Sequence, residues 1–435
     1  MNKVTVIGAG LAGCEAAWQI AGRGIPVRLV EMKPKSFSPA HHSENFAELV
    51  CSNSLKARRI DSAAGLLKEE MRRMESLCMR VADTCSVAAG GALAVDRHIF
   101  SAQITEKIKN HPLIEIVCEQ AEDLPDGIAV VATGPLTQGR LANSIRTICG
   151  DCLSFYDAAA PIVTAESVDM NYAFTASRYE QDGEGDYINC PMDKAEYEAF
   201  YAALMSAETA PLKEFDKNPG VYEGCMPVEV MGARGENTLR FGPMKPVGLR
   251  DPRTGHRPWA VLQLRKENSA GTLYNLVGFQ TNLKFGEQKR VFSMIPALHN
   301  AEFMRYGVMH RNSFLDSPRL LNTDYSLRSC SNLFFAGQLT GVEGYMESAA
   351  SGILAGINAA RRYQGMSPVT PSALTMTGAL THYICDTSVK NFQPMGANFG
   401  VLPPVEPHIR DKRLRYQALS NRALESFAQF LDETK

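Results

Sequence analysis

The stretch that decides the fold lies at the start of the chain and reads Lys3-Val4-Thr5-Val6-Ile7-Gly8-Ala9-Gly10-Leu11-Ala12-Gly13. A short apolar run that ends in glycine predicts a buried parallel strand over residues 3–7. The spacing of the apolar residues that follow predicts a helix from about Leu11 to Ala21, which Gly22 and Gly24 end. The chain therefore opens with a strand, a tight glycine turn and a helix.

The next residues complete a strand–helix–strand unit with an acidic end. Val27–Val30 predicts the second strand, and Glu31 stands at its tip, where a carboxylate can accept hydrogen bonds from both hydroxyls of a ribose. Gly8 permits the tight turn, Gly10 lets the backbone approach a pyrophosphate, and Gly13 allows close packing of helix on strand. The N–H groups at the start of the helix favour phosphate. The pattern predicts a Rossmann-like dinucleotide site.

A second glycine run lies near the other end and reads Gly337-Gln338-Leu339-Thr340-Gly341-Val342-Glu343-Gly344. An apolar strand-like run, Leu333–Ala336, precedes it, and a helix is expected from about Ser348 to Arg362. A simple NAD-binding domain does not need such a distant segment, whereas an extended FAD does. Gly337, Gln338, Gly341 and Gly344 are therefore expected to bind FAD. Many FAD enzymes carry Asp where this chain has Gln338, so that contact is expected to be neutral.

The length of 435 residues exceeds what one hydrophobic core usually holds, so two domains are expected. We predict an α/β fold, a Rossmann-like FAD-binding domain of the glutathione-reductase type (GR2), built from residues 1–154 and 328–435. Ile128–Ala132 should be one of its strands, with Gly134 in the turn on the adenine side. Residues 155–327 should form an inserted α+β substrate domain.

The inserted region has its own predicted elements. Strand-like runs cover Trp259–Leu264 and Leu273–Phe279, and a helix is expected at Lys194–Met205. At the carboxyl end, Lys412–Leu431 has the spacing of an amphipathic helix that packs back on the body.

Composition limits the classes of function. The net charge of −2 gives no global positive field, so contact with nucleic acid requires a local basic patch. No apolar run is long enough to cross a bilayer, and the amino terminus lacks the pattern of a signal peptide. Eleven scattered cysteines, an odd number, predict reduced thiols in the cytoplasm rather than a disulfide framework. The histidines and cysteines have no metal-ligand spacing, so no metal is expected.

Two cysteines are candidates for a reactive thiol. Cys51 is followed by small polar residues and then by cations, and Cys225 lies between glycine and proline on a predicted turn. From the residues alone, an inert buried thiol is favoured for each. A rival redox pair is Cys149 and Cys152, whose spacing suits a flavin-linked dithiol but which no helix-like run follows.

A local basic run mixes cations with an aromatic ring and an imidazole. Its members Arg305, Tyr306, His310 and Arg311 suit an extruded base and its phosphates. A solvated face with a buried structural arginine explains the same residues, and without other information it is the favoured interpretation.

Several long runs carry a family resemblance. They are Cys51–Ser54, Glu223–Pro227, Leu239–Leu249, Val277–Lys284, Arg305–Asn312 and Gly337–Tyr345. Together they resemble the folate- and FAD-dependent tRNA uracil-5-methyltransferases, the TrmFO family, over nearly the whole chain. The GidA family, which modifies wobble uridines in tRNA, is similar in fold but more distant.

The resemblance implies methylation of carbon 5 of uridine 54 in the T-loop of tRNA. Methylenetetrahydrofolate would give the carbon, and NADH or NADPH would give electrons through FAD. Carbon 5 of uracil becomes nucleophilic when a thiolate adds to carbon 6, and a second group must then remove the carbon 5 proton. We assign Cys225 as nucleophile and Cys51 as base or resolving thiol, with the reverse open. Arg311, Tyr306 and Tyr345 are candidates for a platform beneath the extruded base.

Three alternatives remain at this point. One is a GidA-like or ribosomal-RNA-directed uridine-modifying flavoenzyme. Another is a thiol flavin oxidoreductase that uses Cys149 and Cys152, and a third is a catalytically silent FAD-bound RNA-binding protein. The sequence indicates neither the choice between NADH and NADPH, nor the folate pocket, nor the oligomeric state.

Overall fold

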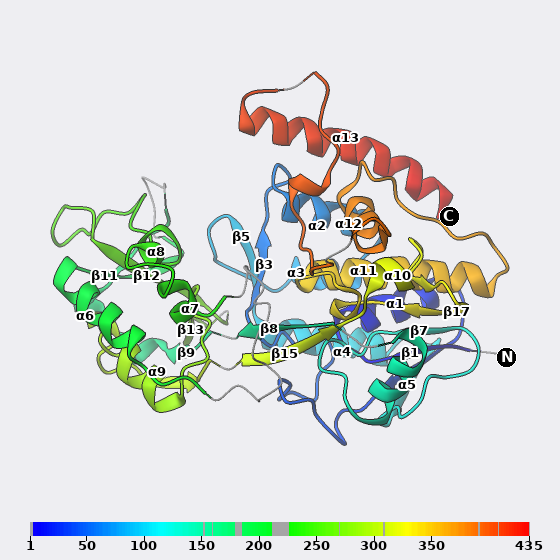
Figure 1. Cartoon of the computed structure of the whole chain (residues 1–435), viewed down its shortest axis with the longest axis horizontal. Helices are drawn as coiled ribbons and strands as arrows, with labels where there is room; N and C mark the ends of the chain where they lie inside the picture. Colours follow the sequence, from blue (N-terminus) through cyan, green and yellow to red (C-terminus); the bar gives the residue numbers. More distant parts are fainter. Residues whose placement is uncertain are drawn as a thin grey trace.

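The computed structural model describes residues 3–150, 153–158, 160–178, 185–210, 226–268, 270–307, 309–389, 392–407 and 409–434, with the backbone alone at 153–158 and 309–311. Two parts lie side by side (Figure 1). The first and last thirds of the chain, blue to cyan and yellow to red, form one part, and the green middle forms the other.

A six-stranded sheet is the centre of the first part. Across the sheet the strands are β16 (Ser326–Leu327), β17 (Cys330–Phe335), β7 (Ala129–Val131), β1 (Val4–Ile7), β2 (Val27–Glu31) and β6 (Ile114–Cys118). All neighbours run parallel except β16, which pairs antiparallel with β17. Strand β7 is fully buried, and so are the apolar residues of β1 and β2, as expected for central parallel strands. The carboxyl ends of β1, β2, β7 and β17 therefore meet at one edge.

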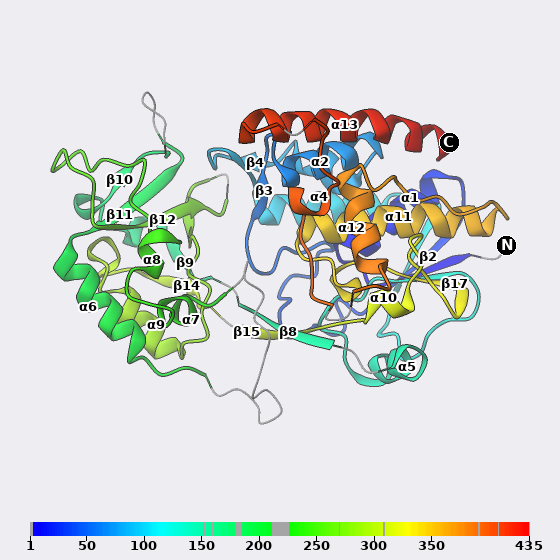
Figure 2. The same cartoon turned by 45° about the horizontal axis from the view of Figure 1, so that its top comes forward.

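Helices cover this sheet and extend away from it. They are α1 (Leu11–Gly22), α2 (Ala63–Arg73), α3 (Leu77–Ala82), α4 (Arg97–Lys109), α5 (Gly139–Cys149), α10 (Ser317–Leu320), α11 (Tyr345–Tyr363), α12 (Met376–Cys385) and α13 (Lys412–Glu433). A small sheet of β3 (Ser54–Ala57), β5 (Ala92–Val95) and β4 (Ser86–Val87) lies on the side of the middle part. Helix α13 crosses the top of the first part (Figure 2).

The first and last segments are locked together by the crossing of α1 and α11. A Cβ atom added at Gly352 would lie 2.2 Å from the carbonyl oxygen of Ala12, and one added at Gly356 would lie 2.8 Å from the Cα of Ala16. Two glycines one turn apart thus let the backbones touch. This contact brings both glycine runs to the same edge of the sheet.

The middle part is built on a second six-stranded sheet. Its order is β10 (Phe174–Thr175), β11 (Tyr187–Met192), β12 (Ala260–Lys266), β13 (Leu273–Leu276), β9 (Ile162–Thr164) and β14 (Phe303–Arg305), all antiparallel. The helices α6 (Lys194–Met205), α7 (Val228–Gly232), α8 (Thr238–Phe241) and α9 (Phe285–Phe292) belong to this part. A separate hydrophobic core, which includes Tyr197, Phe200, Phe279 and Phe292, joins sheet and helices.

An antiparallel ribbon of β8 (Leu153–Ala158) and β15 (Met309–Phe314) connects the two parts (Figure 1). Short 3-10 turns complete the described elements at η1 (Ala165–Ser167), η2 (Met170–Tyr172), η5 (Pro296–Leu298), η6 (Gln338–Thr340) and η7 (Phe399–Val401).

The predicted α/β fold with a Rossmann-like sheet and a second α+β part is confirmed, and most element bounds agree within two or three residues. The helix expected from Ser348 begins at Tyr345, because Gly344 adopts a φ of +124° as its N-cap. The strand expected over Leu273–Phe279 ends at Leu276, ahead of Gly278 with a φ of +77°. Strand β16 joins the first sheet although it precedes residue 328.

Candidate functional site

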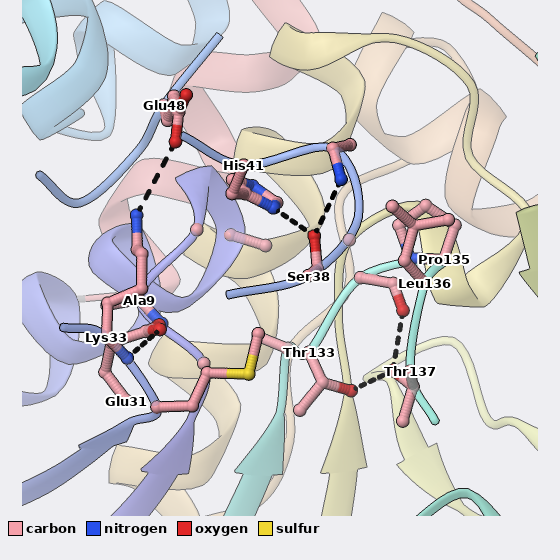
Figure 3. Close-up of a pocket in the computed structure, with 18 of the residues that line it drawn as sticks. Ala9, Glu31, Lys33, Ser38, His41, Glu48, Thr133, Pro135, Leu136 and Thr137 are labelled. Carbon is pink, nitrogen blue, oxygen red and sulfur yellow. Dashed lines mark hydrogen bonds and ion pairs between the residues drawn. The ribbon is translucent and has the colours of Figure 1, made fainter. Parts of the chain in front are cut away.

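A cavity of about 320 Å³ opens at the carboxyl edge of the first sheet, within the range of small-molecule sites. Segments from both ends of the chain line it. Of the residues that the sequence singled out, those on its walls are Gly8, Ala9, Gly10, Leu11, Ala12, Glu31, Cys51, Gly134, Gly337, Gln338 and Tyr345. Figure 3 shows the loop that carries Ser38 and His41 above the strand ends, with Thr133 and Thr137 to one side.

The first glycine run gives the cavity a backbone floor. Gly8 has a φ of +94°, and a Cβ there would lie 2.6 Å from the carbonyl oxygen of Ala132. A Cβ on Gly13 would lie 1.8 Å from the carbonyl oxygen of Gly8, so this residue serves helix packing rather than the cavity wall. A Cβ on Gly10 would meet nothing within 4 Å. The first turn of α1 has no acidic side chain, so its N–H groups favour an anion in the cavity.

Glu31 is fixed at the end of β2 by two backbone donors. Its Oε2 accepts from the N–H of Ala9 at 2.6 Å, and its Oε1 accepts from the N–H of Lys33 at 3.0 Å (Figure 3). The side chain of Lys33 is buried, donates to the carbonyls of Ser43 and Asn45, and lies 3.9 Å from Glu48. Burial lowers the pKa of this lysine. The carboxylate of Glu31 is therefore oriented on the cavity wall.

The loop over the cavity is held by its own polar side chains. Ser38 Oγ and His41 Nδ1 are 2.5 Å apart, and Glu48 accepts from the backbone N–H groups of His42 and Ser43. Burial, with the positive charge of Lys33, lowers the pKa of His41, so the imidazole favours its neutral form. His41 therefore adds no second positive charge to the cavity wall beside that of Lys33.

The second glycine run reaches the cavity with Gly337 and Gln338. Gly337 has a φ of +79°, and its N–H donates to Ser351 Oγ at 2.7 Å. The amide of Gln338 donates to the buried carboxylate of Glu343 at 2.6 Å, so the amide is oriented from within its own loop. The contact offered by Gln338 is neutral, in line with the missing Asp.

Gly341 and Gly344 lie outside the cavity lining and shape the loop instead. A Cβ at Gly341 would lie 2.5 Å from the ring of Phe392. A Cβ at Gly344 would lie 2.2 Å from Glu347 Oε2 and 2.7 Å from Lys56 Nζ. Gly341 has a φ of +83° and Gly344 a φ of +124°, and this conformation, which favours glycine, explains both residues without a ligand.

Cys51 lies on the cavity wall against the first residue of α11. The hydroxyl oxygen of Tyr345 accepts from the N–H of Cys51 at 2.8 Å and from that of Ser52 at 3.2 Å, and it lies 2.9 Å from the sulfur of Cys51. Burial, together with the nearby Cys51, raises the pKa of Tyr345 well above its ordinary value. The phenol therefore keeps its proton and can share it with the sulfur.

Arginines of the middle part hold the same loop from the other side. Arg265 on β12 donates to Asn53 Oδ1 at 3.1 Å and to Ser52 Oγ at 2.7 Å, and Arg305 on β14 donates to the carbonyl of Val50. Burial lowers the pKa of both guanidinium groups. The cysteine loop is thus clamped between the two parts of the molecule, and Arg305 is a structural partner of this loop.

A buried ion pair adds to the charge around Cys51. Arg97, at the start of α4, lies 2.8 Å from Glu267, and both side chains are almost fully buried. With Arg265 and Arg305, three guanidinium groups and one carboxylate surround the loop.

Tyr306 is stacked between two phenylalanines rather than placed at the cavity. Its ring centroid lies 5.0 Å from that of Phe285 and 5.4 Å from that of Phe303. The backbones of His310 and Arg311 lie in the β15–β8 ribbon. The structure therefore brings Tyr345 to Cys51, while Tyr306 lies in an aromatic stack of the middle part.

Of the other three candidate cysteines, one lies within the described residues. Cys225 and Cys152 lie outside the described residues. Cys149 is buried at the end of α5 in the core of the first part.

Several residues of the site carry no sequence signal. Lys33, Asn312 and Ser348 line the cavity, and Arg97 and Arg265 approach Cys51 only because β12 and α4 come together in space. In the described ranges, no three His, Cys, Asp or Glu side chains gather as metal ligands. Among the helices of those ranges, none has the length and apolar character needed to cross a bilayer.

Comparisons with known proteins show the family. The sequence profile of the glucose inhibited division protein A family matches residues 3–367. The chain is 57% identical over 431 residues to the methylenetetrahydrofolate--tRNA-(uracil-5-)-methyltransferase TrmFO of Brevibacillus brevis, covering 99% of this chain and 98% of that protein. It is 58% identical over 435 residues to the protein of the same name from Acetivibrio thermocellus, covering 100% and 99%.

Solved structures show the same fold at low sequence identity. GidA of Aquifex aeolicus superposes with a TM-score of 0.71 at 16% identity, over 99% of this chain and 73% of that one. A second crystal form gives 0.69 at 17% identity, over 99% and 78%. By its full-length identity to those relatives, this chain belongs to the TrmFO family, a branch of the glucose inhibited division protein A family.

Proposed function

We propose that this protein methylates carbon 5 of uridine 54 in the T-loop of tRNA. Methylenetetrahydrofolate provides the carbon, and NADH or NADPH provides the electrons through FAD. The observation that carries the proposal is the 57–58% identity, over the whole chain, to relatives named for tRNA uracil-5-methylation with this folate. The cavity beside Cys51 supplies a place for the chemistry.

The residues of the cavity fit FAD. Gly10 leaves the backbone open where a pyrophosphate would approach, and the start of α1 offers its N–H groups to the phosphates. Glu31 is oriented to accept from ribose hydroxyls, while Gly134 lies across the cavity and Gln338 offers an amide from the second glycine run. When bound, FAD supplies the two-electron reduction that turns a methylene into a methyl group.

We assign the covalent step to Cys225. Its thiolate adds to carbon 6 of uracil, the ring electrons move to the carbonyl, and carbon 5 becomes the nucleophile that accepts the one-carbon unit. Cys51 then removes the proton of carbon 5 or resolves the adduct, with the reverse assignment as the alternative. The phenol of Tyr345 lies 2.9 Å from the sulfur of Cys51, and Arg265 holds the same loop through Asn53, so the sulfur has a partner for proton exchange.

The assignment is tested with 5-fluorouracil-containing tRNA, which traps the adduct because fluorine at carbon 5 cannot leave as a proton. We expect Cys51→Ala to form the covalent adduct and Cys225→Ala to form none, on a denaturing gel. Cys330→Ser is the matched control, since Cys330 is exposed at the start of β17. An adduct with Cys225→Ala and none with Cys51→Ala would reverse the two roles.

The reaction itself is tested by release of tritium from carbon-5-labelled uridine in tRNA. We expect release that requires methylenetetrahydrofolate and a nicotinamide reductant, and purified protein that is yellow with bound flavin. Loss of 5-methyluridine at position 54 of tRNA after deletion of the gene would support the T-loop as the target. Loss from ribosomal RNA or from the wobble position instead would contradict the proposal in favour of the alternatives.

We also propose which part of the chain binds which ligand. Residues 1–154 and 328–435 would bind FAD, and residues 155–327 would bind substrate, because the second sheet and its separate core lie within the latter range. The folate and the T-arm of tRNA would meet where β12 and β14 contact the Cys51 loop. The substrates place the reaction in the cytoplasm.

A further inference from the structure

A second hollow lies away from the cavity, where α13 begins. About 660 Å³ in volume, it is bordered by the segment that follows β3, by the start of α2 and by the 3-10 turn η7. We call it the basic groove and define it by Arg59, Phe399, Lys412, Arg413 and Tyr416, which line it. In Figure 1 the amino-terminal end of α13 is the end nearer the middle part of the molecule.

Positive charge is concentrated at this groove although the whole chain is slightly acidic. Arg59, Lys412 and Arg413 are exposed, and so are their chain neighbours Arg58 and Arg410. Two carboxylates lie among these cations and offset part of their charge. Asp61 lies 3.1 Å from Arg59, and Asp411 accepts from the N–H of Leu414 as the N-cap of α13. A local patch of this kind is what a chain with a net charge of −2 needs to bind a polyanion.

The cations at the start of α13 lower the stability of that helix. The first turn of α13 begins Lys412-Arg413 at the positive end of the helix dipole, where acids are favoured, and the one acid at this end is the N-cap Asp411. The first turn of α2, whose residues Ser62, Ala63 and Ala64 also line the groove, lacks an acid. Side chains that weaken their own helix are expected where they serve a ligand, and an anion between two such helix ends relieves the repulsion.

Aromatic rings complete the chemistry of the groove. The rings of Phe399 and Tyr416 lie 4.4 Å apart, and Lys412 and Arg415 lie 5.5 Å and 5.8 Å from the centre of the Tyr416 ring. Both rings are half-buried, and cations beside aromatic rings at a surface are typical of sites that bind the backbone and bases of single-stranded nucleic acid. This combination favours RNA over a lipid surface, which needs no stacking ring.

The groove is within reach of the proposed reaction centre. Arg59 follows Cys51 by eight residues through β3, which limits their separation to about 26 Å of extended chain. We propose that the basic groove binds the sugar–phosphate backbone of the tRNA substrate, outside the catalytic cavity. This inference rests on the proposed function, since it names a contact of the same substrate.

The test is the affinity of the full-length, FAD-loaded protein for T-arm-containing tRNA as a function of salt. The variant is Lys412→Gln with Arg413→Gln, and the control is Lys107→Gln with Arg146→Gln, which removes two exposed cations from α4 and α5. Each phosphate contact contributes about 0.7–0.9 to the slope of log affinity against log salt. Loss of two contacts therefore weakens binding about thirty-fold near 0.1 M salt and hardly at all near 1 M.

We expect the groove variant to show this roughly thirty-fold loss of tRNA affinity and the control variant to bind tRNA as the wild type does. Both variants should oxidise NADPH through the bound flavin at the wild-type rate. The melting temperature of the groove variant should not fall, because the helix dipole favours removal of these cations. Arg59→Gln, on a different element, should repeat the effect at about half the change in slope. Wild-type affinity and slope in the groove variants would overturn the inference. Failure of the wild-type protein itself to bind tRNA would instead contradict the proposed function.

Discussion

Replacement of Gly352 by alanine tests whether the contact between α1 and α11 makes the two ends of the chain act as one cofactor site. Alanine is the best helix former, and in an open helix it would stabilise by about 1 kcal/mol relative to glycine. At Gly352, however, the new Cβ would lie 2.2 Å from the carbonyl oxygen and 2.6 Å from the Cα of Ala12. These are backbone atoms, so the clash is relieved only if the two helices move apart.

The magnitudes predict a net loss of stability and of flavin. Overpacking of this kind lowers the free energy of unfolding by about 1–3 kcal/mol, and the higher helix propensity of alanine offsets about 1 kcal/mol of that loss. The same movement separates the first glycine run, which begins α1, from Gly337 and Gln338, which precede α11. We expect FAD affinity to fall by at least about ten-fold, or ~1.4 kcal/mol.

Gly22→Ala is the matched control, because Gly22 is the last residue of α1 and its new Cβ would meet nothing within 4 Å. Urea unfolding followed by flavin fluorescence, together with FAD titration of the apoprotein, measures both quantities. We expect the control to be as stable as wild type or more so, by up to ~1 kcal/mol. If Gly352→Ala matches the control in stability and in FAD affinity, the close crossing is not what unites the two segments.

Three other changes give separate tests. Tyr345→Phe removes the hydroxyl oxygen that accepts from two N–H groups of the Cys51 loop, which costs about 1–3 kcal/mol of stability for each donor left unpaired. We expect turnover to fall more than about ten-fold while the flavin content stays at the wild-type level. Loss of flavin would instead show that Tyr345 has only a structural role. Arg265→Lys cannot reach both of its partners, so turnover should fall at unchanged FAD affinity, and wild-type kinetics would refute the clamp. Lys68 is buried with its pKa lowered to about 7, so the wild-type protein loses stability as pH falls from about 10.5 towards 7, by up to about 5 kcal/mol. Lys68→Met should abolish that slope in urea unfolding between these pH values, and an unchanged slope would contradict the assignment.

The parts of the fold that depend on local chemistry could be predicted from the sequence. The apolar residues of strands β1 and β2 are buried, and the glycines at 8 and 337 adopt positive φ where the preceding strand turns into the next element. Helix α6 has the predicted bounds Lys194–Met205, since Asp193 and Glu196 form a capping box that fixes its start. Such signals lie within a few residues of the element they specify.

The contacts that define the candidate site could not be predicted, because they join residues far apart in the chain. Tyr345 and the N–H of Cys51 are separated by 294 residues, and Arg265 and Asn53 by 212. No spacing rule links such pairs; they follow from the packing of α11 on α1 and of β12 against the small sheet. Tyr345 was expected at a base platform on resemblance alone, and its place beside Cys51 emerged only from the fold.

The crossing of α1 with α11 also has a consequence for biosynthesis. Roughly 340 residues separate Ala12 from Gly352, which at about 5–20 residues per second is tens of seconds of translation. Until β17 and α11 have been synthesised, the nascent amino-terminal strands lack both of these packing partners. Only the first glycine run of the flavin site is then present. Cofactor capture must therefore follow synthesis of α11 (Tyr345–Tyr363), and ribosome-bound chains truncated before Gly337 should remain colourless.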